Sequence, residues 1–371
     1  NGRAYKKPEL LADGKYRVLR VGNFFTSKNW YYSDLELDDT KYCDNGDLLY
    51  AWSASFGARL WEGEKVIYHY HIWRVDINEE IIDKRFLFYW FEFDKELIKL
   101  ASGTGTTMMH VSKSSMEKRE IHLPPLAEQQ RIVAKLDAAF AEIDAAIEVA
   151  NAKVKEVNCL FKKELENTFS NGEFESVNLE KLAKVTSSKR VLKSHYVESG
   201  IPFYRTKEIK ELANGNPIRT ELFISQEQFS EFKNKFGAPQ AGDVLITAIG
   251  TIGEVYVVQQ GDEFYFKDGN ILWLRNISGL NSDYLRYSLI NFVDELNSLA
   301  HGAAYSALPI QRLKSHKIPI KTLSEQTSSV VKLDALGKLT QDIDKLNSNK
   351  ILALGVLKSA LLAQELQSEA A

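Results

Sequence analysis

The chain has 371 residues, of which 44% are hydrophobic and 26% charged, so it is too long for one hydrophobic core and apolar enough to fill two. Cys43 and Cys159 have no partner motif, which excludes a disulfide framework and a cysteine zinc site and favours a reducing cytoplasm. No membrane span or signal peptide is indicated, and the net charge of -3 leaves only local patches for nucleic-acid contact.

Short strands separated by turns are predicted for the first part of the chain, followed by a helix of ordinary length. β-Branched and aromatic runs indicate the strands, and glycine, aspartate and asparagine bound them. The strands cover 17–25, 46–52 and 65–77, and the helix covers 83–101. The same succession returns with strands at 201–206, 242–249, 254–261 and 270–277 and a helix at 282–300. We therefore expect α+β globular regions.

A single long helix is predicted from residue 126 to about 170, because this stretch lacks glycine and proline and is rich in helix formers. Pro124 and Pro125 mark its beginning, since a missing N–H costs nothing in the first turn. Apolar residues recur at steps of three and four, which is typical of a coiled coil. The predicted seam comprises Val133, Leu136, Phe140, Ile143, Ile147, Ala150, Val154, Val157 and Phe161.

A second long helix is predicted from Leu323 to about Gln364. Its apolar residues follow similar steps, although Gly337, Lys350 and Gly355 interrupt the pattern. The predicted seam comprises Leu336, Leu339, Ile343, Leu346, Ala353 and Leu357. Because one face of each helix has to meet another helix, we expect the two to pair. At about 1.5 Å per residue, each is long enough to act as a spacer.

The two halves of the chain are similar in the same order. Residues 46–61 align without a gap on residues 242–257, and the Glu-Gln and Lys-Leu-Asp sequences of 126–137 return in 323–334. Similarity that is collinear over about 185 residues indicates a duplicated domain rather than a short repeat. The predicted parts are two mixed domains and two helices, at 1–125, 126–171, 172–322 and 323–371.

Signatures of catalysis are absent from the sequence. It contains no GxxxxGK[ST] phosphate loop, no GxGxxG after a strand, no HExxH and no GxSxG. His69 and His71 are expected on one face of a strand, where two imidazoles could bind a metal, but no third ligand follows, so polar groups on a half-buried strand are the preferred interpretation. Asp262, Glu263 and Lys267 loosely resemble a nuclease cluster that the first copy lacks. We expect neither a catalytic centre nor a metal site in this chain.

Basic residues gather at equivalent places in the two copies. Residues 1–24 hold six basic and two acidic residues, and residues 184–210 hold seven and two. Aromatic residues lie between them, as is typical of a surface that contacts phosphates and reaches base edges. Solvated turns are often rich in lysine too, but duplication favours binding. The candidate DNA-contact residues are Arg3, Tyr5, Lys6, Lys7, Arg20, Lys189, Arg190, Lys193, Tyr204, Arg205 and Lys207.

Two alternatives stay open within this set. Arg20 and Arg205 are expected at equivalent positions on short strands, where each could read a base edge or serve as a structural hydrogen-bond donor. The lysines lie in turns and are better placed for phosphate. A second candidate surface is the stretch 103–115 with its counterpart 302–315, whose small residues allow close approach but which could equally be plain turns.

The sequence PPLAEQQRIVAKLD at 124–137, between two diverged mixed domains and followed by a second helix, resembles the DNA-specificity subunits of type I restriction-modification systems. The resemblance covers the whole chain. It implies two tandem α/β target recognition domains, each reading one half of a split asymmetric DNA sequence, and an antiparallel coiled coil that fixes their separation. Members usually begin with a strand like 176–186, so the first domain is expected to lack its first residues here.

The resemblance also implies partners. Double-stranded DNA would be the ligand, and the chain would be a non-catalytic cytoplasmic subunit without a cofactor of its own. Two modification subunits would bring S-adenosylmethionine for adenine N6-methylation, and motor subunits would bring ATP and Mg for translocation and cleavage. The alternative is a coiled-coil scaffold that binds only protein, which would leave the paired basic loops unexplained.

Overall fold

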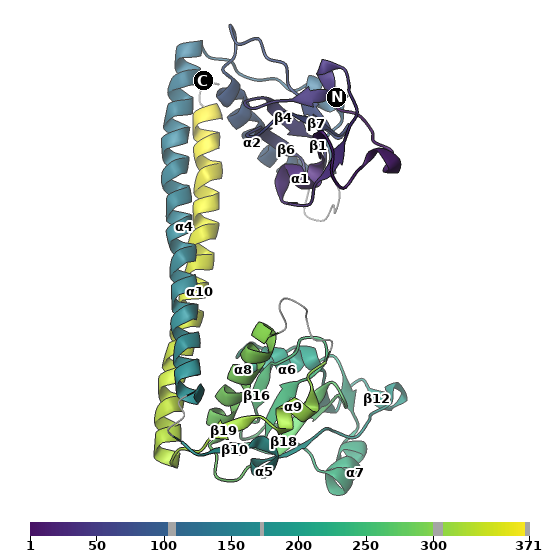
Figure 1. Ribbon diagram of the computed structural model, residues 1–371, viewed down its shortest axis with the longest axis vertical. Helices are drawn as coiled ribbons and strands as arrows, with labels where there is room; N and C mark the ends of the chain where they lie inside the picture. The colour runs from purple at the N-terminus through teal and green to yellow at the C-terminus, as the bar shows by residue number, and fades with distance from the viewer. Residues whose placement is uncertain (103–108, 171–173, 300–306, 368–371) are drawn as a thin grey trace. The chain divides into compact units, whose positions relative to one another are not determined.

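The computed structural model describes four stretches of the chain, namely residues 1–102, 109–170, 174–299 and 307–367. It forms two compact units, each with a mixed α and β region and a part of both long helices (Figure 1). The first unit comprises 1–151 and 347–371, and the second comprises 152–346. The predicted α+β class is therefore confirmed. No helix within the described stretches is long and apolar enough to cross a membrane.

The mixed region of the first unit contains two larger sheets and one two-stranded sheet among the described residues. Its strands are β1 (Tyr16–Leu19), β2 (Tyr31–Ser33), β3 (Tyr42–Cys43), β4 (Leu48–Ala51), β5 (Ser53–Ala54), β6 (Gly57–Leu60), β7 (Val66–Tyr68), β8 (Ile72–Arg74) and β9 (Met109–His110). Its helices are η1 (Lys7–Glu9), α1 (Val21–Phe25), η2 (Asp39–Lys41), α2 (Lys84–Ser102) and α3 (Lys113–Glu117). The sheets have the orders β2-β1-β7-β3 and β6-β4-β8, and β5 pairs with β9. Helix α2 packs on the second sheet, where Phe91 meets Leu48 and Tyr50.

The second unit repeats this plan with more strands. They are β10 (Ser176–Asn178), β11 (Lys184–Thr186), β12 (Tyr196–Val197), β13 (Ile201–Tyr204), β14 (Phe223–Ile224), β15 (Val244–Thr247), β16 (Val255–Val257), β17 (Tyr265–Phe266), β18 (Ile271–Arg275) and β19 (Lys317–Pro319). The helices are α5 (Leu179–Leu182), η3 (Lys193–His195), α6 (Thr206–Ala213), α7 (Gln226–Phe236), α8 (Ser282–Leu299) and α9 (Ile310–Lys314). The sheets have the orders β11-β18-β15-β16, β12-β14-β13-β17 and β10-β19.

Two of the predicted strands of the first unit differ from the structure. The strand expected at 17–25 ends at Leu19, and α1 follows because the Phe24 amide donates to the Arg20 carbonyl at 2.8 Å. A single helical turn places the Phe24 side chain in the core, where it is fully buried. The strand expected at 65–77 is interrupted by a turn between β7 and β8. Aromatic and β-branched content alone does not reveal either break.

The duplicated glycine-aspartate pairs form the same turn in both units. Gly46 and Gly242 have φ angles of 88° and 87°, in the left-handed region that favours glycine. The carboxylates of Asp47 and Asp243 each accept a hydrogen bond from the backbone N–H three residues earlier, at 2.9 and 3.0 Å. The repeated sequence thus encodes a shared backbone frame.

Gln129 and Gln326 join each mixed region to its long helix, α4 (Leu126–Ser170) or α10 (Leu323–Gln367). Both side chains are fully buried. Their amide oxygens accept from the backbone N–H of Asp83 at 2.8 Å and of Asn281 at 2.7 Å. Their amide nitrogens each donate to two backbone carbonyls, at 3.0 and 2.8 Å in the first unit and 3.1 and 2.9 Å in the second. The repeated Glu-Gln sequence is therefore a structural joint.

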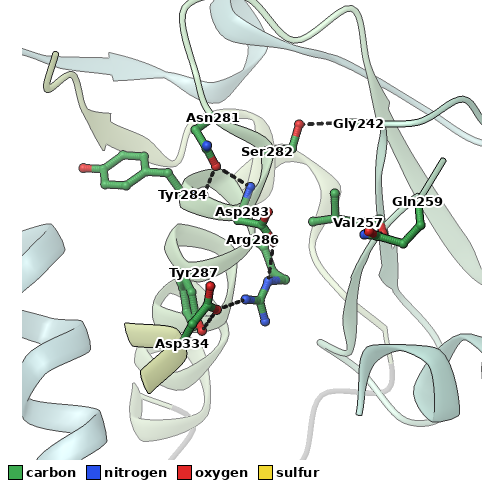
Figure 2. A network of polar contacts seen from close by, with 10 residues as sticks. All are labelled: Gly242, Val257, Gln259, Asn281, Ser282, Asp283, Tyr284, Arg286, Tyr287 and Asp334. Carbon is green, nitrogen blue, oxygen red and sulfur yellow. Dashed lines mark hydrogen bonds and ion pairs between the residues drawn. The ribbon is translucent and has the colours of Figure 1, made fainter. Parts of the chain in front are cut away.

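The repeated Lys-Leu-Asp sequence completes this joint. In the second unit, Tyr287 and Arg286 of α8 both donate to the Asp334 carboxylate, at 2.6 and 2.9 Å (Figure 2). Asp137 of α4 accepts equivalent bonds from Tyr89 and Arg85 of α2. Asp137 therefore holds α2 against α4, and Asp334 holds α8 against α10.

Replacement of Gln129 by leucine is expected to destabilise the first unit. The substitution leaves one backbone N–H and two carbonyls unpaired in a buried place, and each such group costs about 1–3 kcal/mol. We expect the free energy of unfolding to fall by about 3 kcal/mol or more. The exposed neighbour provides a control, because Gln130→Leu should change that free energy by about 0.5 kcal/mol or less. Urea unfolding followed by circular dichroism measures both free energies of unfolding. If Gln129→Leu and Gln130→Leu have equal stabilities, the hydrogen bonds of Gln129 do not hold the mixed region to α4.

The long helices pair in an antiparallel sense. In the first unit, Lys135 near the beginning of α4 contacts Glu365 near the end of α10, with 2.7 Å between Nζ and Oε1. In the second unit, Glu164 near the end of α4 contacts Lys332 near the beginning of α10 at 2.8 Å. The predicted pairing of the helices is therefore confirmed.

The seam of α10 differs from the prediction. On α4, the residues Val133, Leu136, Phe140, Ile143 and Ile147 are buried or half-buried. On α10, Leu336 and Ile343 are half-buried, but four predicted seam residues are exposed and do not belong to the seam, namely Leu339, Leu346, Ala353 and Leu357. Asn347 lies in it instead, 8% exposed, and donates to the Ala150 carbonyl at 2.8 Å. That hydrogen bond makes burial of an amide tolerable, which a search for apolar spacing misses.

Candidate nucleic-acid interface

Arg20 and Arg205 occupy equivalent positions, but neither lies on a strand as predicted. Each directly follows a strand, β1 or β13, and caps the next helix, α1 or α6. β1 runs parallel to β7, and β13 runs parallel to β17, so each arginine stands beside the turn that follows the partner strand. The duplication therefore delivers one arginine to the same place in each unit.

Arg205 is held by two carboxylates. Its guanidinium donates to Glu208 and to Glu221, both at 2.7 Å, and its backbone N–H donates to Glu208 at 2.8 Å. Burial alone would raise the pKa of Glu208, which is 2% exposed, but the hydrogen bonds from Arg205 lower that pKa below its usual value. The Arg205 side chain remains 36% exposed. It caps α6 and still reaches the surface.

Arg20 has a different environment. Its guanidinium carbon lies 4.2 Å from the centre of the Tyr31 ring, which is a cation–π contact. Its Nε is buried without a hydrogen-bond partner among the residues that the structure describes. Tyr31 itself is 40% exposed. Arg20 thus stacks on the Tyr31 ring, whereas Arg205 forms two ion pairs.

Two of the other candidates in the first unit have structural roles. Arg3 forms an ion pair with Glu9, with 2.8 Å between the nearest atoms. The Tyr5 ring packs against the cluster of Val18 and Ile67, and burial raises the pKa of its hydroxyl. Lys6 and Lys7 are exposed on the same segment. Only these two lysines keep the properties expected of phosphate contacts.

A basic pocket of about 690 Å³ brings several candidates together in the second unit. Arg190, Lys193 and Arg205 line it with Lys267 and Asn270. Its remaining wall is apolar and is formed by Val191, Leu192, Tyr196 and Leu222. Three cationic candidates from two separate segments, 190–193 and the end of β13, therefore converge on one hollow. A concave surface with this charge is suited to a polyanion.

The remaining candidates of the second unit lie outside this pocket. Lys189 is exposed, with its ammonium 5.3 Å from the centre of the Phe236 ring. Tyr204 is half-buried and stacks on Phe264 at 4.7 Å, and Lys207 pairs with Glu221 at 3.1 Å. Tyr204 is therefore a packing residue.

Lys267 and Asn270 line the pocket although neither is among the predicted DNA-contact residues. The sequence motif at Lys267 indicates only a loose likeness to a nuclease cluster, and no motif marks Asn270. The Asp-Gly pair between two strands signals a turn, but its closeness to Arg205 depends on the parallel pairing of β13 with β17. In the second candidate surface, 103–108 and 300–306 lie outside the described residues, so that proposal rests on β9, α3 and α9 alone.

His69 and His71 lie at the turn between β7 and β8 rather than on one continuous strand. Their rings are 4.8 Å apart between centres. The described part of the chain has no group of three or more side chains able to hold a metal ion. Burial, and then the neighbouring His71 and Arg20, lower the pKa of His69 to about 4. The imidazole is therefore neutral at neutral pH, with one nitrogen that donates and one that accepts.

Comparisons with known proteins agree on one family. The model of the type I restriction modification DNA specificity domain matches residues 1–156 and 171–353. A chain of Haemophilus influenzae named as a type I restriction enzyme specificity subunit is 30% identical over 272 residues, covering 72% of this chain and 67% of the relative. The specificity subunit of the type I restriction enzyme EcoBI from Escherichia coli is 21% identical over 415 residues, covering 100% and 83%.

Solved structures show the same fold. A chain from a structure of a type I restriction-modification system has a TM-score of 0.74 at 20% identity, and the match covers 95% of this chain and 92% of that one. The HsdS subunit from Thermoanaerobacter tengcongensis has a TM-score of 0.52 at 19% identity, covering 95% and 90%. At these identities the likeness bears on the fold.

Proposed function

The chain belongs to the family of type I restriction-modification DNA specificity subunits, and from this premise we propose that its two units bind double-stranded DNA, each reading one half of a bipartite asymmetric site. The observation that carries the proposal is the duplicated frame. In each unit a strand that runs parallel to its neighbour ends at an arginine beside a turn. In the second unit this arginine opens onto the basic pocket. Two equivalent sites on one chain suit two half-sites on one duplex.

The proposed role is to supply sequence reading and to leave catalysis to partners. Modification subunits would hold S-adenosylmethionine for adenine methylation, and motor subunits would hold ATP and Mg for translocation and cleavage. The similar chain with a TM-score of 0.74 comes from a structural study of how a type I restriction-modification complex assembles, which supports assembly with such partner subunits. A scaffold that binds only protein is less favoured, because it gives no role to the basic pocket.

Two substitutions at the basic pocket separate DNA binding from structural support. Lys193→Ala is expected to weaken binding evenly across DNA sequences and to reduce the salt dependence by about one counterion, because its ammonium is exposed and suited to phosphate. Arg205→Ala is expected to destabilise the second unit by about 2 kcal/mol, because the buried Glu208 carboxylate loses the guanidinium that neutralises it and keeps only the backbone N–H donor.

Both variants should be measured in the full chain assembled with its modification subunits, by fluorescence anisotropy on duplex DNA over a range of salt and by thermal melting. Lys235→Ala is the matched control, because Lys235 is an exposed lysine on α7 that does not line the pocket. If the wild type binds DNA and Lys193→Ala binds it equally well, the pocket is not part of the DNA interface. No DNA binding at low salt would favour the scaffold.

A further inference from the structure

We propose that the turn after β7 in the first unit and the turn after β17 in the second determine which bases the two units read. The residues concerned are His69 and Tyr70 in one turn and Lys267 and Asn270 in the other. The inference rests on the proposed function and adds to it the side chains that distinguish the half-sites. It comes from a set of backbone hydrogen bonds that the two units share.

The two turns begin on the same hydrogen bond. The His69 N–H donates to the Leu19 carbonyl at 2.9 Å, and the Lys267 N–H donates to the Tyr204 carbonyl at 2.8 Å. Leu19 and Tyr204 directly precede Arg20 and Arg205 in the sequence. His69 and Lys267 are therefore equivalent residues, and each starts its turn beside the equivalent arginine.

The two turns also end on the same hydrogen bond. The His71 carbonyl accepts from the Trp52 N–H at 3.1 Å, and the Asn270 carbonyl accepts from the Ala248 N–H at 2.8 Å. The turns differ by one residue in length between these fixed points. A common backbone frame thus presents two short segments of different sequence at the same place.

The frame extends one bond further in both units. The carbonyls of Trp52 and Ala248 accept from the N–H groups of Val111 and Leu308, at 2.9 and 2.8 Å. Backbone bonds of this kind do not depend on side-chain identity. The side chains on the frame are therefore free to differ while the backbone stays in place.

Several residues that are the same in both copies have structural roles, whereas the turn residues differ. The shared Gly-Asp turns, the buried glutamines and the helix aspartates all hold the fold together. An asymmetric site requires the two units to present different chemistry at equivalent places. The turns meet this requirement, with an aromatic and imidazole set in one and a lysine, aspartate, glycine and asparagine set in the other.

The turn side chains are accessible. Tyr70 is 40% exposed, and the Lys267 side chain is 33% exposed. Lys267 and Asn270 line the basic pocket, where Arg190 and Lys193 supply the charge suited to neighbouring phosphates. Asp268 lies 3.4 Å from the Lys267 ammonium and offsets part of its charge.

The two sets suit different base edges. The asparagine amide can pair with the N6 and N7 atoms of adenine, and a lysine ammonium with O6 and N7 of guanine. In the first unit, the neutral His69 offers one donor and one acceptor, and the exposed Tyr70 ring, 4.4 Å from it between centres, offers an apolar face. We therefore expect a purine contact from the second turn and a contact of different chemistry from the first.

The test is a selection from randomised duplex DNA by the full chain assembled with its modification subunits, followed by sequencing of the bound pool. Asn270→Ala should relax one half-site and lower its discrimination by about 5- to 150-fold, with the other half unchanged. The double variant His69→Ala, Tyr70→Ala should relax only the opposite half. Lys235→Ala on α7 is the control and should leave both halves unchanged.

Further variants and a melting curve separate reading from folding. Asn270→Asp keeps the size of the side chain and removes its donor, so it should change the preferred base without lowering the melting temperature. If these variants keep both half-sites of the wild type, the turns do not read bases, while the proposed function stands. If the wild type itself selects no sequence, the proposed function fails and the assignment of the turns fails with it.

Discussion

Exchange of residues 1–125 for the matching region of another family member is expected to replace one half of the recognised DNA sequence completely and to leave the other half unchanged. The reason is that the first unit has its own cores, in which strands of both sheets bury residues such as Phe24 and Tyr50. Sequencing of methylated positions in cells that carry the chimera with its partner subunits would read both halves at once.

The joint at Gln129 makes this exchange feasible. That side chain belongs to α4, and its hydrogen bonds within the described part of the chain all go to backbone groups of the replaced region. Any incoming domain with the same backbone path can supply these groups. The reciprocal chimera, with residues 174–322 exchanged, should change only the opposite half. A chimera that changes both halves together would contradict two autonomous reading units.

Much of the fold could be predicted because the information is local or repeated. The long helix from Leu126 has no glycine or proline and a regular apolar seam, so its beginning and its pairing face follow from the sequence. The repeated Glu-Gln and Lys-Leu-Asp sequences revealed the duplication. They did not reveal the joints, because the buried role of Gln326 depends on backbone groups brought to it from a distant loop.

The parts that could not be predicted depend on contacts between distant residues. The largest apolar side chains of α10 suggested Leu339 and Leu346 for the seam, but the helix buries Asn347 because the Ala150 carbonyl is there to accept its amide. The approach of Lys267 to Arg205 likewise follows from the pairing of β13 with β17, strands that lie far apart in the chain. Charge counts locate basic segments and do not show which of their residues meet.

Insertion of four residues into both α4 and α10 is expected to lengthen the gap at the centre of the recognised DNA sequence by about two base pairs. Four helical residues add about 6 Å, and successive base pairs are about 3.4 Å apart. The insertion points should follow Asn151 and Leu346, where the two units meet within each helix. The bond between Asn347 and Ala150 then stays in the first unit, and the Glu164 to Lys332 contact stays in the second.

Insertion into α4 alone is the control for this experiment. It shifts one helix by four residues against the other, so the contacts of one unit can form only if those of the other are lost. We expect this variant to melt at a lower temperature, whereas the matched double insertion should keep the wild-type stability. Methylation mapping then reads the gap of the double variant. A stable double variant that methylates sites with the original gap would show that the paired helices do not set the spacing.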